Sequence, residues 1–154
     1  MIKKLADRGI EILPLTLHVG WGTFAPLPET DLESHLLHSE YYCIPLKTAQ
    51  RIQSCLAAGK KVVACGTTAA RALESAAQAP GRLGPLEGET RIFIRPGYIW
   101  KIVKALVTNF HLPRSSLLIM ACAFGGRERI LAAYEQARNL NYRFYSYGDA
   151  MLLL

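Results

Sequence analysis

A polar loop between two apolar segments, at residues 108–116, constrains the fold more than any other part of the chain. The apolar run 102–107 has the length and composition of a strand, and the run 117–124 has those of a helix. The nine residues between them carry an amide, an imidazole and three hydroxyls. A short polar loop that rigid elements hold at both ends suits a binding or catalytic site.

Two other junctions have the same character, at residues 17–24 and 64–68. The first reads Leu17-His18-Val19-Gly20-Trp21-Gly22-Thr23-Phe24, and the second reads Ala64-Cys65-Gly66-Thr67-Thr68. Each follows a segment with the composition of a strand. Polar groups at three strand exits predict one active edge of an α/β sheet.

Strand-like and helix-like segments alternate along the chain. We expect strands at 10–19, 40–44, 61–65, 91–94, 98–108 and 142–145. We expect helices at 2–8, 45–59, 69–79, 117–124 and 127–139, with Ser115 or Ser116 as the N-cap of the fourth. Residues 79–90 are expected to form a long loop. The pattern predicts an α/β fold with helices packed on a mixed sheet, in a layered αβα arrangement, and one domain over residues 1–154.

Composition excludes several classes of protein. The chain has 154 residues, of which 51% are apolar and 19% charged, so it is not disordered. No apolar run reaches the roughly 18 residues that span a membrane, and no signal peptide follows Met1, so we expect a cytoplasmic protein. The net charge of +6 favours phosphate-bearing partners without identifying one. Cys55, Cys65 and Cys122 lie in apolar segments, which favours buried free thiols over disulfides.

Five motifs, in order along the whole chain, resemble one known family. They are Leu15-Thr16-Leu17-His18-Val19-Gly20 with Gly22-Thr23-Phe24; His38-Ser39-Glu40-Tyr41; Gly66-Thr67-Thr68 with Arg71 and Leu73-Glu74-Ser75; residues 107–113; and Tyr147-Gly148-Asp149-Ala150-Met151. Each motif alone is weak, but the five in sequence are highly specific. The chain is similar to the S-adenosylmethionine:tRNA ribosyltransferase-isomerases of queuosine biosynthesis.

The resemblance implies an enzyme, both transferase and isomerase, that uses S-adenosylmethionine as ribosyl donor. The acceptor would be 7-aminomethyl-7-deazaguanine at the wobble position of a tRNA. The transferred ribosyl moiety isomerises to an epoxycyclopentanediol, which gives epoxyqueuosine, and adenine and methionine are released. The resemblance also implies a layered α/β domain with an inserted β-barrel domain.

The family's chains are considerably longer than this one. The resemblance places residues 1–154 in the C-terminal portion of the family's catalytic domain, without the inserted barrel and the N-terminal segment. A motif with its own histidine belongs to that missing upstream part. We therefore expect catalysis to need a partner, either the missing N-terminal half or a second copy. Trp21 also departs from the small or aliphatic residue that is usual there.

The implied reaction needs a base to remove a proton next to a sulfonium. An imidazole suits this task near neutral pH, so His111 is the first candidate and His18 the second. For each, a structural role in tying the loop backbone together is the alternative. Glu40 would face the sulfonium or bind ribose hydroxyls, or else be a strand-edge charge. Asp149 would bind a hydroxyl or shape its turn.

Three residues at a helix start are candidates for binding an anion. Gly66, Thr67 and Thr68 offer free backbone N–H groups and hydroxyls, which suit a carboxylate or a phosphate. Arg71 follows in the first turn, where the helix dipole disfavours a cation unless an anionic ligand lies nearby. An ion pair between Arg71 and Glu74 is the alternative.

The other candidates come from the remaining motifs. Asn109 and Phe110 would recognise and stack a nucleobase, although Phe110 suits a core equally well. The rings of Trp21, Phe24 and Tyr147 would contact the sulfonium, with apolar packing as the favoured alternative. The set of predicted substrate-binding residues is completed by Thr23, His38, Ser115 and Tyr147. The spacing of His35, His38 and Glu40 resembles that of metal ligands. No further thiol or imidazole lies nearby in sequence, so we expect no metal.

Three classes of function stay open. The favoured class is the enzyme domain of the tRNA-modifying transferase, which we expect to be inactive as this chain alone. The second is a non-catalytic remnant that binds tRNA or a nucleotide without turnover. The third is an unrelated transferase that acts on small molecules at a similar sheet edge.

Overall fold

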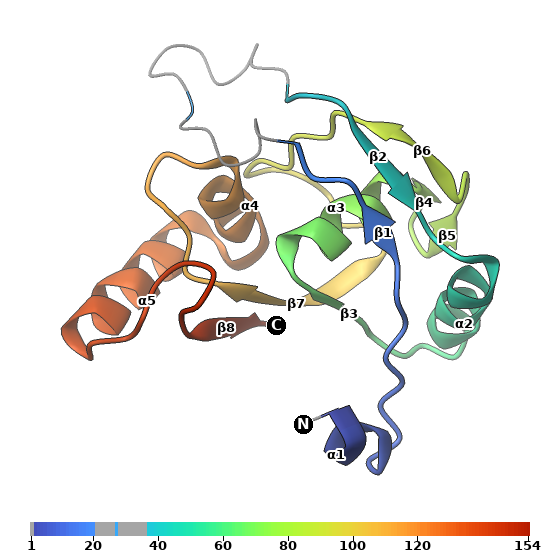
Figure 1. Cartoon of the computed structure of the whole chain (residues 1–154), viewed down its shortest axis with the longest axis horizontal. Helices are drawn as coiled ribbons and strands as arrows, with labels where there is room; N and C mark the ends of the chain where they lie inside the picture. The colour runs from blue at the N-terminus through green and yellow to red at the C-terminus, as the bar shows by residue number, and fades with distance from the viewer. Residues whose placement is uncertain (1, 21–26, 28–36) are drawn as a thin grey trace.

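Helix α3 (Thr67–Ser75) contacts two separate three-stranded sheets (Figure 1). The computed structural model describes residues 2–20, 27 and 37–154. Within them, one sheet has the strand order β1-β2-β6, the other has the order β3-β7-β8, and β4 pairs with β5. The predicted class, an α/β fold with helices packed on a sheet, is confirmed. The strands belong to several small sheets rather than to one.

The first sheet is antiparallel. Its strands are β1 (Thr16–Leu17), β2 (Glu40–Cys43) and β6 (Glu87–Thr90). The predicted strand 10–19 shrinks to two residues because Ile10 and Ile12 lie exposed with no neighbouring strand. The predicted strand 91–94 is wrong. The hydroxyl of Thr90 accepts the N–H of Ile92, and this local bond turns the backbone out of the ladder.

The second sheet is mixed. Strand β3 (Val62–Cys65) runs parallel to β7 (Val103–Asn109), and β8 (Ala150–Leu153) runs antiparallel to β7. The strand predicted at 142–145 is wrong, and β8 forms later in the chain. Asn141 and Tyr145 adopt positive φ angles of 57° and 70°, which are incompatible with an extended strand.

The helices match the predicted periodicity, with shifted ends. Besides α3 they are α1 (Ile2–Ala6), α2 (Leu46–Ala57), α4 (Ser116–Gly125) and α5 (Arg127–Asn139). The expected cap of α4 is confirmed, because Ser115 Oγ accepts the N–H of Leu118 at 3.2 Å. Helix α3 ends earlier than predicted, since β4 (Ala77–Ala79) turns back to pair with β5 (Arg82–Leu83). None of the described helices is long and apolar enough to cross a membrane.

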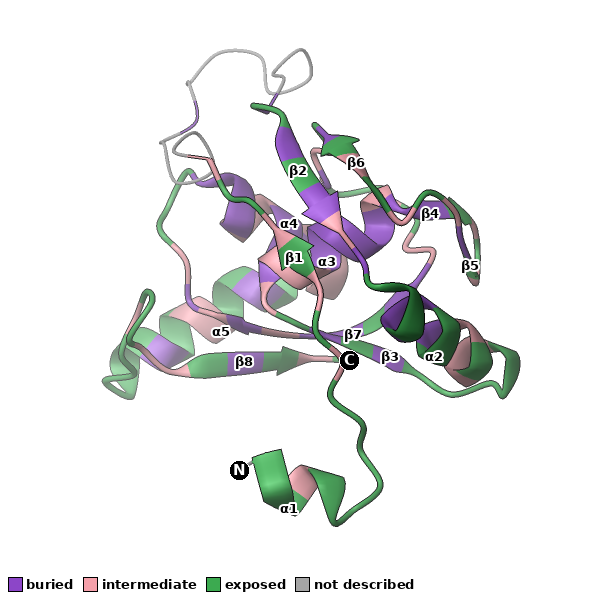
Figure 2. Ribbon diagram, turned by 45° about the vertical axis from the view of Figure 1, so that its right-hand side comes forward, coloured by how far each residue is buried: buried purple, intermediate pink, exposed green. Residues whose placement is uncertain are grey.

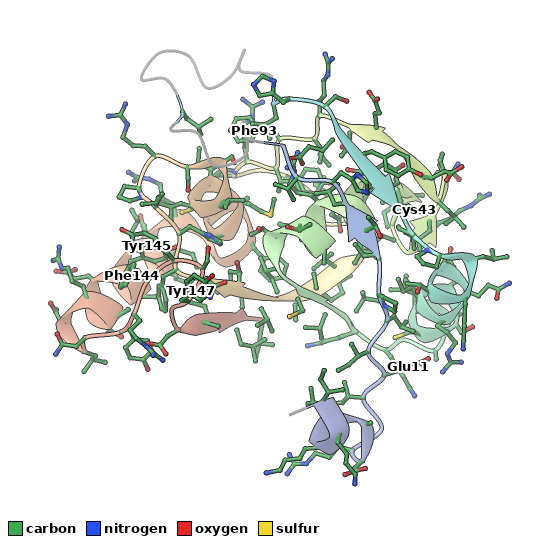
Figure 3. All side chains as sticks on the ribbon, viewed as in Figure 1. Glu11, Cys43, Phe93, Phe144, Tyr145 and Tyr147 are labelled. Atoms are coloured by element: carbon green, nitrogen blue, oxygen red, sulfur yellow. The ribbon has the colours of Figure 1, made fainter. Side chains whose placement is uncertain are left out.

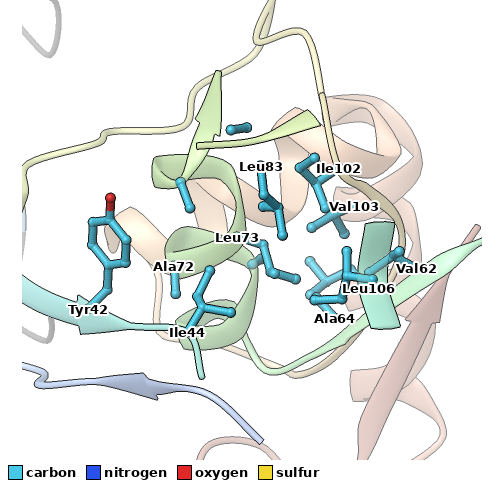
Figure 4. Close-up of a cluster of buried hydrophobic side chains, with 14 of the residues drawn as sticks. Tyr42, Ile44, Val62, Ala64, Ala72, Leu73, Leu83, Ile102, Val103 and Leu106 are labelled. Atoms are coloured by element: carbon cyan, nitrogen blue, oxygen red, sulfur yellow. The ribbon is translucent and has the colours of Figure 1, made fainter. Parts of the chain in front are cut away.

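Small side chains let α3 lie close to its neighbours in the core. Ala70, Ala72 and Ala76 are fully buried, and Leu73 reaches the same cluster as Leu106 of β7 (Figure 4). Alanine loses no side-chain entropy on burial and keeps the helix backbone near the sheet. The alanines of α3 therefore allow the helix to pack closely in the core.

Helix α3 also carries two buried charges, Arg71 and Glu74, each only 2% exposed. The Glu74 carboxylate accepts the backbone N–H groups of Lys101, Ile102 and Val103 at 2.8–2.9 Å, and the Tyr98 hydroxyl at 3.0 Å. Arg71 pairs with Glu40, at the start of β2. One charge thus binds α3 to the chain that enters β7, and the other binds it to the first sheet.

Only one face of the β3-β7-β8 sheet is packed by helices in the described part of the chain (Figure 2). On the other face the strand register aligns Cys65, Val107 and Leu152 in one row. Leu152 is 59% exposed and Val63 is 53% exposed. Cys65 is exposed too, so the prediction that it is buried is wrong, whereas Cys122 is buried. All four cysteines are free thiols, including the three for which the sequence favoured this state.

Replacing Glu74 by glutamine should destabilise the fold by about 2–4 kcal/mol, because the amide NH₂ would face backbone donors in a buried site. Urea denaturation measures this loss. Glu135→Gln makes the same chemical change on the exposed surface of α5 and should alter stability by less than about 0.5 kcal/mol. Equal effects of the two substitutions would contradict a special role for the Glu74 carboxylate.

Candidate functional site

A cavity of about 300 Å³ lies at the carboxyl ends of the parallel strands β3 and β7. Ligands of α/β sheets commonly bind at this end of parallel strands. Three segments line the cavity, and the lining residues are Gly66, Thr67, Thr68, Thr108, Asn109, His111, Leu112, Ser115, Leu117, Tyr145 and Ser146. The first segment follows β3, the second is the end of β7 with the residues after it, and the third precedes β8.

The cavity unites two of the three polar junctions that the sequence singles out. Six predicted site residues line it together: Gly66, Thr67, Thr68, Asn109, His111 and Ser115. The third junction lies elsewhere, because β1 belongs to the other sheet. His18 does not line this cavity. It is exposed, its N–H donates to Tyr41 O, and its ring meets the Tyr41 ring edge-on at 5.6 Å.

His111 is held from two sides. Its Nε2 lies 2.7 Å from the hydroxyl of Thr108, and its backbone N–H donates to the hydroxyl of Tyr134 at 2.7 Å. Burial lowers the pKa of His111 to about 4, so the imidazole is neutral at pH 7. Burial also raises the pKa of Tyr134 to about 12, which keeps that hydroxyl neutral. The site therefore presents an uncharged, oriented imidazole.

The start of α3 forms a second wall of the cavity. Gly66 has a φ angle of 95°, a conformation that glycine adopts without strain, and its N–H donates to Val107 O at 2.8 Å. No side chain caps this helix. Thr67 is only 7% exposed although it lines the cavity. The first backbone N–H groups of α3 thus lie at the cavity wall without a capping acceptor.

The third wall was missed by sequence reasoning. Tyr145 and Ser146 lie on the loop between α5 and β8, where Figure 3 shows Phe144, Tyr145 and Tyr147 close together. The Tyr145 N–H donates to Phe110 O, which anchors this loop to the end of β7. A strand was expected here, and no local signal marks the left-handed turn at Tyr145. Tyr147 is 96% exposed and does not line the cavity.

Glu40 and Arg71 lie together, away from the cavity lining. Besides Arg71, the Glu40 carboxylate accepts the N–H of Gly20 at 3.0 Å. Burial lowers the pKa of Arg71, and the Glu40 carboxylate opposes that shift. An ion pair between Arg71 and Glu74 was the alternative prediction. The Glu74 carboxylate instead accepts the backbone N–H groups of residues 101–103. The pair fixes α3 rather than facing the cavity.

Three further predicted residues have structural contacts. Phe110 is 4% exposed and packs among the rings of Tyr134, Tyr142 and Phe144. The Asp149 carboxylate accepts the backbone N–H of Arg143 at 2.8 Å, which lowers the pKa of Asp149. The Asp149 carbonyl accepts Nδ2 of Asn109 at 3.3 Å.

The remaining candidates cannot be placed at the cavity. His38 is exposed and is not part of its lining. Thr23, Trp21, Phe24 and His35 lie outside the described residues. Among the residues that are described, no group of three or more His, Cys, Asp or Glu side chains is placed to hold a metal ion.

The buried imidazole predicts a pH dependence of stability. The unfolded chain binds a proton at His111 with a pKa near 6.5, whereas the folded chain does so only near pH 4. The stabilisation is therefore complete above about pH 6.5 and is lost as the pH falls towards 4, by about 2–3 kcal/mol. Urea unfolding of wild type and His111→Gln between pH 4 and 7.5 measures it, and the variant should lose this component. An NMR titration midpoint of His111 near 6.5 would contradict the expectation.

Comparison with known proteins identifies the family of this chain. A family model described as queuosine biosynthesis protein matches residues 1–153. The chain is 52% identical over 153 residues to an S-adenosylmethionine:tRNA ribosyltransferase-isomerase of Geotalea uraniireducens, covering 99% of this chain and 45% of the relative. For the one of Gloeobacter violaceus, identity is 51% over 154 residues, covering 100% of this chain and 44% of the relative.

A solved structure gives the same result. The S-adenosylmethionine tRNA ribosyltransferase of Thermotoga maritima superposes with a TM-score of 0.81 at 38% identity, covering 99% of this chain and 48% of that one. The chain thus spans just under half the length of its relatives and matches the C-terminal part of the family's chain. By sequence and by structure, it belongs to the queuosine biosynthesis protein family.

Proposed function

We propose that this chain supplies the reaction cavity of an S-adenosylmethionine:tRNA ribosyltransferase-isomerase. The observation that supports it best is the cavity at the ends of β3 and β7, which combines a neutral imidazole with an uncapped helix start. The ribosyl moiety of S-adenosylmethionine would be transferred to 7-aminomethyl-7-deazaguanine in tRNA and isomerised to give epoxyqueuosine. Membership of the family favours this activity over an unrelated small-molecule transferase.

His111 is the proposed base. If Nε2–H donates to Thr108, Nδ1 keeps a lone pair that can take the proton from the carbon next to the sulfonium. The C–H electron pair stays on that carbon as an ylide, and the proton moves to Nδ1 of His111. The low pKa of His111, about 4, keeps this lone pair free at neutral pH. The Thr108 hydroxyl then acts as a positioning group that selects the tautomer.

We assign the proposed role of stacking a nucleobase to Tyr145 rather than to Phe110. Phe110, first considered for it, is enclosed by other rings, whereas Tyr145 is 51% exposed and lines the cavity. Exposed aromatic rings are common platforms for bases splayed out of an RNA. Exposed Arg127, Arg129 and Arg143 would meet phosphates of the tRNA.

The uncovered face of the β3-β7-β8 sheet is the proposed seat of the part of the family's chain that this sequence does not span. That face is apolar, with Val63, Cys65 and Leu152 exposed in the described structure. More than half of each relative's length lies beyond the match. Exposed apolar patches of this kind mark protein interfaces. Full activity would then require that the missing portion be joined to this chain or supplied beside it.

A hybrid protein tests the activity. In it, this chain replaces the matching part of the Geotalea uraniireducens relative, and epoxyqueuosine formation is measured on tRNA with and without the 7-deazaguanine precursor. His111→Gln should lower kcat by about 100-fold or more with little change in melting temperature. Thr108→Val should lower kcat less, by roughly 10-fold. Equal loss of folding and turnover in His111→Gln would refute the role as base.

Binding without turnover is the second candidate function. It is favoured by the partial coverage of the relatives, since half of a catalytic pocket wall can bind a ligand without completing a reaction. A hybrid that binds precursor tRNA and S-adenosylmethionine but forms no epoxyqueuosine would support this alternative.

The uncovered face gives a separate prediction. Leu152→Glu should weaken the association of this chain with the separately expressed remainder of the relative by at least 10-fold, because it places a charge in an apolar interface. Leu140→Glu makes the same change at a 67% exposed site that follows α5, and it should have no effect. Calorimetry measures both affinities. Equal affinities of the two variants would show that this face is not the interface.

A further inference from the structure

We infer that the start of α3 binds a carboxylate that is carried on a short apolar chain. This inference rests on the proposed function, within which it assigns the methionine carboxylate of S-adenosylmethionine to the Gly66–Thr68 wall of the cavity. The assignment names the end of the substrate that lies farthest from the transferred ribose.

The backbone supplies the first donors. The first hydrogen bond of the helix is donated by Ala70 to Gly66 O at 3.2 Å, so the N–H groups of residues 67–69 precede the helical ladder. Helix α3 has no side-chain cap to satisfy them. Gly66 places no Cβ at the approach, and a Cβ built there would meet no atom within 4 Å. An oxyanion can therefore reach these N–H groups closely.

The Thr67 side chain is an independent sign of a ligand. It is 93% buried by residue area, lines the cavity, and has no hydrogen-bond partner among the described residues. Thr67 lines the cavity, so a carboxylate oxygen bound there would accept the proton of its hydroxyl. The hydroxyl and the neighbouring N–H groups together form a donor set for one oxyanion.

A second helix begins at the same cavity. Ser115 and Leu117, at the N-terminus of α4, also line it. The Ser115 hydroxyl is already used, because it donates to Leu112 O and accepts the N–H of Leu118. Helix α4 therefore contributes the positive end of its dipole more than free hydroxyl donors. Two helix N-termini favour a negative charge at this place.

The lining favours a carboxylate over a nucleic-acid phosphate. No Lys or Arg is among the described residues that line the cavity, so it is suited to a singly charged group. Leu112 and Leu117 add an apolar wall that can hold a hydrocarbon chain with its thioether or sulfonium sulfur. A volume of about 300 Å³ is at the lower end for small-molecule sites and encloses part of a ligand of this size.

Variants of Thr67 separate the donors. Thr67→Val removes only the hydroxyl. Thr67→Pro removes both the hydroxyl and the backbone N–H. Proline is well tolerated at this first helical position. The ψ angle of the preceding Gly66, 146°, is also compatible with a following proline. Thr67→Ser keeps both donors. Thr16→Val is the matched control, because Thr16 is exposed on β1.

The measurement compares two ligands by titration calorimetry, in the full chain and in the hybrid protein. S-adenosylmethionine carries the carboxylate, and its decarboxylated analogue lacks it. Thr67→Val should weaken S-adenosylmethionine binding about 3–10-fold and Thr67→Pro about 30-fold or more, while Thr67→Ser stays within about threefold. Neither Thr67→Val nor Thr67→Pro should change the affinity for the analogue. The melting temperature of each variant shows whether it folds. If Thr67→Pro does not fold, the S-adenosylmethionine affinity of Thr67→Val decides whether the inference holds.

Several results would overturn the inference. One is an equal loss of affinity for both ligands, and another is unchanged affinity for S-adenosylmethionine in Thr67→Val and Thr67→Pro. Weakened binding of a short oligonucleotide with intact S-adenosylmethionine binding would assign the donors to a phosphodiester instead. Carboxylate-dependent binding without transfer to tRNA would leave the inference standing and refute the proposed enzymatic function. Transfer to tRNA without carboxylate-dependent binding would refute the inference and support the proposed enzymatic function.

Discussion

Helix α3 is held in place by two buried charges, and the position of the cavity depends on them. Glu74 accepts three backbone N–H groups ahead of β7, and Arg71 pairs with Glu40 at the start of β2. A buried charge is tolerated only when it is paired and hydrogen-bonded, so each contact strongly disfavours other orientations of the helix. Because the opposite end of α3 is the cavity wall at Thr67, a shift of the helix would displace the site.

Strand pairing brings together the polar loops that form the cavity. The parallel pairing of β3 with β7 brings the chain after Cys65 next to the chain after Asn109. The loop that precedes β8 arrives at the same end because β8 is antiparallel to β7. Three segments that are distant in sequence therefore meet, and none of them needs a long insertion to do so. Burial at this meeting point is what lowers the pKa of His111.

Sequence patterns predicted the parts of the site that depend on local structure. Gly66 and Thr67 stand at a strand-to-helix junction, and Ser115 caps a helix, so their type and spacing were sufficient. Tyr145 was missed because its left-handed backbone is stabilised by a hydrogen bond to Phe110 O, 35 residues away in sequence, which no local pattern encodes. The Glu40–Arg71 pair likewise joins residues 31 apart. His18 was assigned to the same edge because strand order cannot be read from a strand exit.

The inner part of the cavity and its rim differ in their exposure to solvent. His111 is already desolvated within this chain, since its pKa is lowered by burial without any added wall. The rim is different, because Tyr145 is 51% exposed to solvent. The proposed ylide would be quenched by water, so the proposed transfer would require a further wall that excludes solvent. Under the proposed function, this chain would orient the base and hold one end of the donor, and turnover would depend on the part of the family's chain that it does not span.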